Sequence, residues 1–415
     1  MKLFNLVIAF FLFTGAAQAA TLTELQQEAL NNRKIIEKYQ ANLEIGKKNV
    51  NLAKSRYYPS VDFSYTVNAL DESSAIENKE NSVAYGAITW NLFSGFQDKY
   101  NVKSAKLSRK AEEIRLQGIK QDIQLNVALR YLSIYTRKAS LNVAEDSYAT
   151  LLKIYNDAEN RFNVGLIKKN ELLRFKVDLD NAVITQKKAQ AELDKSVQLL
   201  RREIDTDIEP EQLLFSEFDQ LPGIRDYNQY ETEMLKNRSE LQTLQELTQA
   251  AQAQTKAAYG SIYPRVDLSS SYLKYNDDFG PAGDIYDEEI RTKLTLSINL
   301  FDGFSKYNRV DKAKLIVDTL QYDLIELECD LKTQLKNLFL DYGVSSENVE
   351  VAQSSIEQAE ENLRITRMSY QEGIEKESDL LDAITSLSRA QYNYVAAKSE
   401  VFANYFKITR AIEGF

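Results

Sequence analysis

Histidine is absent from this 415-residue sequence, and cysteine occurs once, at Cys329. Without histidine the chain lacks the commonest general base and the commonest metal ligand. A lone cysteine excludes an intrachain disulfide and a thiolate metal cluster. Glycine (14) and proline (5) are scarce, which leaves few places to turn and predicts long uninterrupted elements. We therefore expect no enzymatic activity, no metal site and no cofactor.

The charge balance narrows the choice of partners. The formal net charge is −10. A negative chain is a poor partner for nucleic acid or for an anionic membrane surface, because both repel it. We expect no nucleic-acid partner.

Residues 1–19 have the pattern of a signal peptide. Lys2 precedes an apolar run from Leu3 to Phe13, and Ala17-Gln18-Ala19 fits an A-x-A cleavage site. The run is too short to span a bilayer as a helix. The alternative is a buried N-terminal helix. We expect a mature chain that starts near Ala20, is exported across an inner membrane and, with no cysteine at the cleavage site, carries no lipid anchor there.

The mature chain contains an internal repeat. The stretch NLFSGFQDKYNVKSAK begins at Asn91, and NLFDGFSKYNRVDKAK begins at Asn299. Each half reads as a helix, a Tyr-Pro break, two alternating segments, a Gly-Phe turn and a long helical run. A period of roughly 200 residues is too long for a solenoid. We predict a first repeat over 20–208, a linker over 209–223 and a second repeat over 224–415.

The helical runs are long and follow coiled-coil spacing. Between Gln97 and Asn160 there is no proline and one glycine, Gly118. In the next runs, steps of four and three alternate, as in a coiled coil; the alternative is an ordinary helical bundle. The first seam is Leu172, Lys176, Leu179, Val183, Gln186, Gln190, Leu193, Val197, Leu200 and Ile204, and the second is Leu380, Ile384, Leu387, Gln391, Tyr394, Lys398, Val401, Tyr405, Ile408 and Ile412.

Four segments alternate between apolar and polar residues, which is typical of strands with one apolar face. Their apolar residues are Val61, Phe63, Tyr65 and Val67; Ala84, Ile88, Trp90 and Leu92; Val266, Leu268 and Tyr272; Leu294, Leu296, Ile298 and Leu300. The length suits tilted transmembrane strands, and aromatic residues lie within or near them. The loops at 71–81 and 276–289 are long and acidic. The alternative is a pair of soluble hairpins.

Transmembrane strands would require the chain to form an oligomer. In lipid every backbone polar group must be paired, so strands cross only as a closed barrel. Four strands cannot close one, and eight leave no channel. Three chains supply twelve strands and a lumen.

The chain resembles the TolC-like outer-membrane efflux protein family. The resemblance covers essentially all of the mature chain and rests on the duplication, the Asn-Leu-Phe-x-Gly-Phe stretches and two segments, RFNVGLIKKNELL from Arg161 and SYQEGIEKESDLLDA from Ser369. It implies an α+β membrane protein: a homotrimer with a twelve-stranded barrel in the lipid of a Gram-negative outer membrane, continued by an antiparallel α-helical coiled-coil tunnel across the periplasm.

The resemblance also implies a function. Family members are passive conduits that dock onto an inner-membrane transporter through a periplasmic adaptor, in tripartite efflux or type I secretion. It implies adaptor-docking helix tips, where glycine permits a left-handed turn; the alternative is a plain capping turn. The tip residues are Arg161, Phe162, Gly165, Leu166, Ser369, Tyr370, Gly373 and Ile374.

The resemblance places Asp379 and Asp382 at the tunnel entrance. Threefold symmetry would turn them into two rings of carboxylates that attract cations. Taken alone, two aspartates near a helix start complement the helix dipole.

The resemblance also implies a latch, a set of contacts that keeps the entrance closed. The chain departs from the family at one position of this latch. Tyr370 matches the family's tyrosine, and Glu171 falls at its acidic partner. Glu375 stands where the family has arginine, a reversal of charge. Lys168 or Lys169 could pair with Glu375 instead.

Three other classes remain open from the residues alone. A periplasmic coiled-coil adaptor would need glycine-rich segments around a single hairpin. An exported enzyme would need a carboxylate pair in a cleft. A fibrous structural protein would explain the helices but not the strands. The sequence does not indicate the exported substrate, the pump or the adaptor.

Overall fold

The computed structural model describes residues 20–73, 79–275 and 288–415. The predicted signal peptide (1–19) and most of the predicted acidic loops (74–78 and 276–287) lie outside the described residues. Within the described ranges, no helix combines the length and the apolar composition needed to cross a bilayer.

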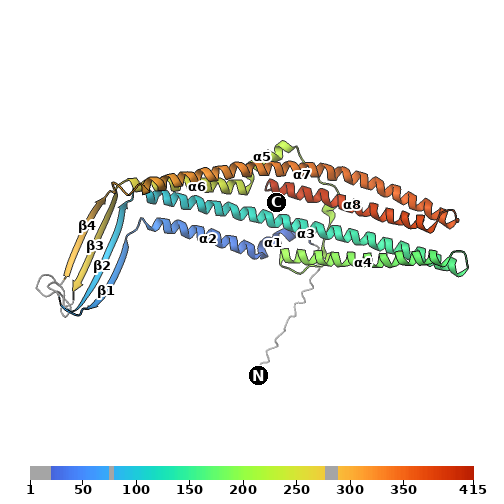
Figure 1. The fold of residues 1–415 in the computed structure, drawn as a ribbon, viewed down its shortest axis with the longest axis horizontal. Helices are drawn as coiled ribbons and strands as arrows, with labels where there is room; N and C mark the ends of the chain where they lie inside the picture. The colour runs from blue at the N-terminus through green and yellow to red at the C-terminus, as the bar shows by residue number, and fades with distance from the viewer. Residues whose placement is uncertain (1–19, 74–78, 276–287) are drawn as a thin grey trace, which may run out of the picture. The chain divides into compact units, whose positions relative to one another are not determined.

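Two helices of 67 residues each dominate the fold, as the scarcity of proline predicts. Of the four prolines that the structure describes, three lie outside helices and Pro210 begins the short 3-10 helix Pro210–Gln212, so in the described residues no proline ring interrupts a helical hydrogen-bond ladder. The helices (Figure 1) are α1 Leu22–Asn32, α2 Lys34–Ser55, α3 Gln97–Asn163, α4 Lys169–Ile204, α5 Tyr227–Asn237, α6 Ser239–Tyr259, α7 Ser305–Gln371 and α8 Glu377–Ala411.

The four predicted strands are present and form one antiparallel sheet in the order β1-β2-β3-β4 (Figure 1). They are β1 Ser60–Ala69, β2 Glu80–Phe93, β3 Arg265–Tyr275 and β4 Glu288–Ser297. The register aligns the apolar residues: Val61 pairs with Ile88, and Leu268 pairs with both Trp90 and Leu294. Since side chains alternate along a strand, one face of the sheet is apolar and the other polar, as predicted.

The last predicted strand was placed too far along the chain. β4 ends at Ser297, so Ile298 and Leu300 lie beyond it. Ser297 pairs with Arg265, the first residue of β3, and the preceding Pro264 has no N–H to offer a ladder. The apolar-polar alternation in the sequence therefore extends beyond the end of the strand.

The predicted apolar row of β2 also needs a correction near its end. Asn91 pairs with Asp267, and the next paired residue is Phe93, opposite Val266. The extra residue, Leu92, forms a bulge. Phe93 rather than Leu92 continues the apolar row, because a bulge shifts the alternation by one residue.

Two compact units make up the chain. One consists of Met1–Ile36, Ile119–Leu235 and Leu331–Phe415, and the other of Glu37–Gly118 and Lys236–Asp330. Each unit draws segments from both predicted repeats. The sheet and its flanking helix ends belong to the second unit, and the predicted helix tips to the first.

The predicted linker is packed into the core of the first unit. Phe218 is fully buried, with its ring 4.8 Å from that of Phe402 and 5.5 Å from that of Tyr131. Burying a side chain of this size contributes about 2 kcal/mol to folding. Ala20 forms a bridge to Leu213 in the same segment.

The predicted seams hold over most of their length. Leu193, Val197, Leu200 and Ile204 are buried in α4. Leu380, Ile384, Val401 and Ile408 are buried in α8.

Two residues of the first seam are wrong, because Lys176 and Gln190 are both exposed. Lys176 is exposed and pairs with Asp180 at 2.6 Å, while the neighbouring Phe175 is buried. An aromatic ring gains more from burial than a lysine, which would have to lose the hydration of its charge.

Candidate functional site

The two helix tips of the first unit end in the same turn. Gly165 follows α3 with φ +78°, and Gly373 follows α7 with φ +76°. The N–H of Leu166 donates to the carbonyl of Arg161 at 2.8 Å, and that of Ile374 to Ser369 at 2.9 Å. This six-to-one bond closes a helix when the residue before it is left-handed, which glycine allows without steric cost. The predicted glycine turns are confirmed.

Both turns present apolar side chains to water. Val164 and Leu166 are each 71% exposed, and Ile374 is 78% exposed. Neither the turn nor the helix ends need these side chains to be apolar. Exposed apolar groups gathered at one point favour contact with another protein.

Arg161 links the two helical hairpins at their tips. Its Nη2 donates to the carbonyl of Gln371 at 2.8 Å and its Nη1 to that of Tyr370 at 3.4 Å. The guanidinium lies 5.3 Å from the centre of the Tyr370 ring, which also packs edge-on against Phe175 at 5.9 Å. A cation at the last carbonyls of α7 also complements the negative end of that helix.

A second link joins the N-terminal ends of α4 and α8. Arg174 Nη1 lies 2.7 Å from Glu377 Oε1. The carboxylate is largely buried and the guanidinium is mostly exposed. The sequence carries no local signal for this pair, because its members belong to different halves of the chain.

The residues of the predicted latch lie at the tips, but the chain by itself does not join them. The Tyr370 hydroxyl is buried without a hydrogen-bond partner among the described residues. Glu375, Lys168 and Lys169 are exposed, and within the described chain no ion pair joins them. Glu171 is half-buried. Burial raises the pKa of Tyr370, and the charge of Arg161 opposes this shift.

The two predicted entrance aspartates have different surroundings. Asp379 accepts the backbone N–H of Lys376 at 3.2 Å and the hydroxyl of Ser378 at 3.4 Å, so it caps α8. Asp379 therefore has the capping role that is common for an aspartate at the start of a helix. Asp382, one turn further along the same helix, is exposed.

A third aspartate approaches this group from α4. Burial, and then the negative charge of Asp382, raise the pKa of Asp178. The two carboxylates come from different hairpins, and only the fold brings them together. The acidic surface therefore includes Asp178, which the sequence analysis did not single out.

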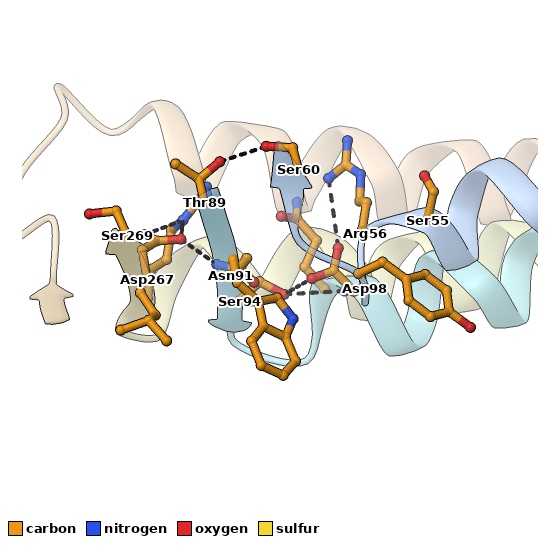
Figure 2. A pocket seen from close by; sticks show the side chains of 14 residues that line it. Ser55, Arg56, Ser60, Thr89, Asn91, Ser94, Asp98, Asp267 and Ser269 are labelled. Atoms are coloured by element: carbon orange, nitrogen blue, oxygen red, sulfur yellow. Dashed lines mark hydrogen bonds and ion pairs between the residues drawn. The ribbon is translucent and has the colours of Figure 1, made fainter. Parts of the chain in front are cut away.

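A polar cavity of about 660 Å³ lies in the second unit, where the sheet passes into the helices (Figure 2). Asn91 donates to Asp267 at 2.8 Å, and Arg56 lies 3.7 Å from Asp98. Ser60 and Thr89 share a hydrogen bond of 2.6 Å, and Ser94 bonds to Asp98. The Ser60–Thr89 and Asn91–Asp267 bonds join neighbouring strands. The contacts of Asp98 with Ser94 and Arg56 tie the turn after β2 and the end of α2 to the start of α3, as Figure 2 shows.

The turn beside this cavity accounts for the repeated sixteen-residue stretch. Gly95 and Phe96 have φ of +63° and +66°, and Gly303 and Phe304 have +67° and +66°. Two successive left-handed residues turn the chain from a strand into a long helix. At Gly95 an added Cβ would lie 2.3 Å from the carbonyl oxygen of Gly260, whereas Gly303 has open space.

One family model matches the chain over two segments. The model is described as "Outer membrane efflux protein" and covers residues 25–204 and 232–412. Each segment spans one of the predicted repeats almost completely.

Individual relatives agree with this match over nearly the whole chain. The chain is 21% identical to the outer membrane protein TolC of Escherichia coli (strain K12) over 96% of its length and 83% of that protein. It is 20% identical to the outer membrane efflux protein BepC of Brucella suis biovar 1 (strain 1330), over 95% and 88%. Its fold matches the solved outer-membrane channel OprN with a TM-score of 0.80 and 18% identity, over 95% and 90%.

Proposed function

This chain belongs to the outer membrane efflux protein family, a family of channel proteins rather than enzymes in Gram-negative outer membranes, and from this premise we propose that it forms a passive trimeric export conduit. The observation that carries the proposal is the sheet. Its four strands have an apolar face and two open edges, and β2 and β4 lead through turns into the two helices of 67 residues.

The two open edges of the sheet support an assembly of three chains. Within the described residues β1 pairs only with β2, and β4 only with β3. In lipid, unpaired edge groups are too costly to persist, so the sheet must close through copies of itself. Three copies give twelve strands, enough for a lumen, with the apolar face towards lipid and the polar face towards the channel.

Exposed apolar side chains on two helices of the second unit support the same assembly. On α2, Ile45 is 57% and Leu52 is 66% exposed; on α7, Leu315, Tyr322 and Ile325 are 65%, 67% and 58% exposed. Such surfaces need a partner. We infer that α2 of one copy packs against α7 of the next, a head-to-tail contact that closes after three copies.

Two copies of one structural unit, 20–208 and 224–415 joined by 209–223, account for the repeat. The family model matches twice, and α3 and α7 have equal lengths. The left-handed residues also recur at equivalent places, after β2 and β4 and at both tips. Duplication would give the barrel and the tunnel the same connection twice.

The tips form the periplasmic entrance in this proposal. Val164, Leu166 and Ile374 would contact a periplasmic adaptor, which connects the conduit to an inner-membrane transporter in tripartite efflux or type I secretion. Asp382 with Asp178, repeated around the axis, would favour cations at the entrance.

Native mass measurement of the protein extracted from outer membranes tests the assembly. We expect a trimer that conducts ions when reconstituted in a planar bilayer, and loss of export when the gene is deleted. A monomeric or dimeric protein in the membrane would contradict the twelve-stranded barrel.

A further inference from the structure

The internal repeat aligns the four strands as two equivalent pairs. The repeated sixteen-residue stretches align Asn91 of β2 with Asn299, just past the end of β4. The segments that follow Tyr-Pro, SVDFSY from Ser60 and RVDLSS from Arg265, align β1 with β3. Each pairing of strands in the sheet can therefore be compared with its counterpart in the other half of the chain.

The two hairpins have the same register under this alignment. Ser60 pairs with Thr89 in the first hairpin, and their counterparts Arg265 and Ser297 pair in the second. The repeat therefore applies to the geometry of the sheet as well as to the sequence.

One pairing lacks a counterpart within the chain. β2 pairs with β3, whereas β4 and β1 lie at opposite edges of the sheet. The counterpart of the β2–β3 pairing is therefore β4 of one copy against β1 of a second copy. Because α2 precedes β1 and α7 follows β4, the same pairing brings α2 of one copy to α7 of the next.

The end of β4 is shorter than the end of β2. β1 reaches β2 only as far as Thr89, so β3 alone holds the last residues of β2, up to Phe93. β4 stops at Ser297, and in the residues that follow Leu300 and Phe301 are 85% and 71% exposed. A neighbouring strand that the single chain does not supply accounts for the difference.

A side-chain hydrogen bond of the β2–β3 pairing also lacks its counterpart. Asp267 accepts from Arg265 of its own strand and from Asn91 of β2, the latter at 2.8 Å. Asp62, the counterpart of Asp267, accepts from Ser60 of its own strand at 3.2 Å, and within the described residues it has no donor from another strand. Asp62 is exposed, and so is Asn299, the counterpart of the missing donor.

A buried cation favours a carboxylate at Asn299. Lys306 is 5% exposed and donates to the backbone carbonyl of Asn299 at 2.6 Å, with its Nζ 3.5 Å from the side-chain Oδ1. Asp302 accepts the backbone N–H of Lys306 at 3.0 Å, but in the part of the chain that the structure describes the Lys306 ammonium forms no ion pair. A buried charge without an opposite charge is costly. A carboxylate bound to the exposed amide of Asn299 would lie close to this charge.

We propose that β1 of a partner subunit pairs with β4 in the register that β3 has on β2. Asn299 then donates to Asp62 of the partner subunit, and Thr295 lies opposite Thr66 of the partner subunit. The proposal rests on the proposed trimer and specifies the contact between its subunits.

The same register lengthens β4. Phe301 lies opposite Val61 of the partner subunit, as Phe93 lies opposite Val266. Leu300 forms a bulge, as Leu92 does in β2.

Cysteine cross-linking in outer membranes tests the register. In a Cys329→Ser background, Thr295→Cys combined with Thr66→Cys places two thiols at opposed positions. Opposed residues have Cα atoms about 4.5–5.5 Å apart, which suits a disulfide, whereas diagonal neighbours are about 7–8 Å apart. We expect products of two and three chains. A bond within one chain is excluded, because two strands separate β1 from β4.

Two matched controls shift the register and keep the thiols on the polar face. They combine Thr295→Cys with Ser64→Cys or with Asn68→Cys, and both should lose most of the cross-linked product. If the Thr295→Cys variants do not assemble, Ser297→Cys makes the same comparison: it should cross-link with Ser64→Cys and not with Thr66→Cys.

Val61→Cys tests the longer β4 and its bulge. Combined with Phe301→Cys it should give cross-linked chains. Combined with Leu300→Cys, the residue that a strand without a bulge would place there, it should give almost none.

The side-chain bond has a separate test in the temperature at which the trimer dissociates in detergent. Asp62→Ala and Asn299→Ala should each lower this temperature, and the double variant should lower it no further, because the two residues share one bond. Asp71→Ala, at an exposed acid beyond the end of β1, should leave it unchanged. Additive losses from Asp62→Ala and Asn299→Ala would mean that the two residues do not meet.

Native mass measurement of the same preparations separates the possible failures. A trimer that cross-links better through a shifted pair, or through none of the pairs, refutes the register and leaves the proposed function standing. A monomer without cross-links in every variant, and in the Cys329→Ser parent, refutes the proposed function.

Discussion

Arg174 of α4 and Glu377 of α8 form an ion pair with 2.7 Å between Nη1 and Oε1, and they connect the two helical hairpins at their tips. The pair lies beside the bonds of Arg161 to the end of α7. Together these contacts hold α7 and α8 against α3 and α4. If the entrance opens by separation of the hairpins, both contacts must break.

The ion pair should therefore influence gating. Glu377→Gln should raise the single-channel open probability, because a pair with one exposed partner contributes about 0.2–1 kcal/mol to the closed state. The charge swap Arg174→Glu with Glu377→Arg should restore wild-type gating. Lys176→Gln, which alters a pair within α4 alone, is the control. An open probability unchanged in Glu377→Gln would mean that the pair does not hold the entrance.

The alternation in β4 predicts different effects at neighbouring positions. Leu294 lies on the apolar face opposite Leu268, and Thr295 lies on the polar face opposite Asp267. Leu294→Lys should cost about 2–4 kcal/mol if the site is near the bilayer midplane. Thr295→Lys should be tolerated, since it would face the channel. Trimer yield in outer membranes measures both, and equal yields would refute the assigned faces.

The two strand-to-helix turns should tolerate alanine unequally. At both Gly95 and Gly303 the left-handed backbone costs a residue with Cβ about 1–2 kcal/mol. At Gly95 the new Cβ would also collide with the carbonyl of Gly260, whereas Gly303 has free space around it. Gly95→Ala should block folding, and Gly303→Ala should only lower thermal stability. Two equal effects would mean that Gly260 moves away.

The exposed apolar tip should matter for docking and not for stability. Leu166 is 71% exposed, so Leu166→Asp removes little buried surface and should change the unfolding free energy by less than about 0.5 kcal/mol. It should abolish adaptor binding and export. Val177→Asp, at an exposed apolar position of α4 away from the turn, is the control. Binding of the adaptor to purified trimer, with export in cells, checks both variants.

In the proposed conduit, the carboxylates of Asp379 and Asp382 should set ion selectivity. Asp382→Asn should weaken cation preference in salt-gradient recordings. Asp379→Asn neutralises a charge while leaving an amide that can still accept the N–H of Lys376, so it separates charge from capping. If neither variant shifts the reversal potential, the acidic surface does not act on permeating ions.

Asp178 should make stability depend on pH in a particular direction. Its folded pKa lies above the ordinary 3.8, so the folded state binds a proton more readily than the unfolded state. The charged form therefore destabilises the fold at neutral pH, and this penalty disappears as pH falls through the raised pKa. Asp178→Asn should stabilise the protein at pH 7, with a gain that shrinks on acidification. Exposed Asp146→Asn should show no such trend, and a gain independent of pH would refute the assignment.

Local features of the chain were readable from the sequence. Period-two alternation is a property of adjacent residues, so it located all four strands, and the absence of proline located the long helices. Gly165 and Gly373 were identified as turns because only glycine adopts that backbone freely. The family's entrance aspartates and tip residues were reached through resemblance, and their roles at an entrance stay predictions.

The alternating pattern does not predict where a strand ends. The alternation passed through Leu300, but β4 stops at Ser297, because pairing needs a partner strand as well as a pattern. The bulge at Leu92 and the burial of Phe175 instead of Lys176 also depend on neighbours from other parts of the fold. A residue's neighbours in space decide which face of an element is covered.

The sequence by itself determined the elements, their order and the turns between them, since these follow from backbone propensity and short-range periodicity. Only the tertiary structure decided the contacts at the tips: Arg174 with Glu377, Arg161 with the end of α7, and Asp178 with Asp382. Each of these joins residues from different halves of the chain. Their approach depends on how two helical hairpins pack against each other. A pattern of hydrophobicity along the sequence does not encode the distance between residues on different hairpins.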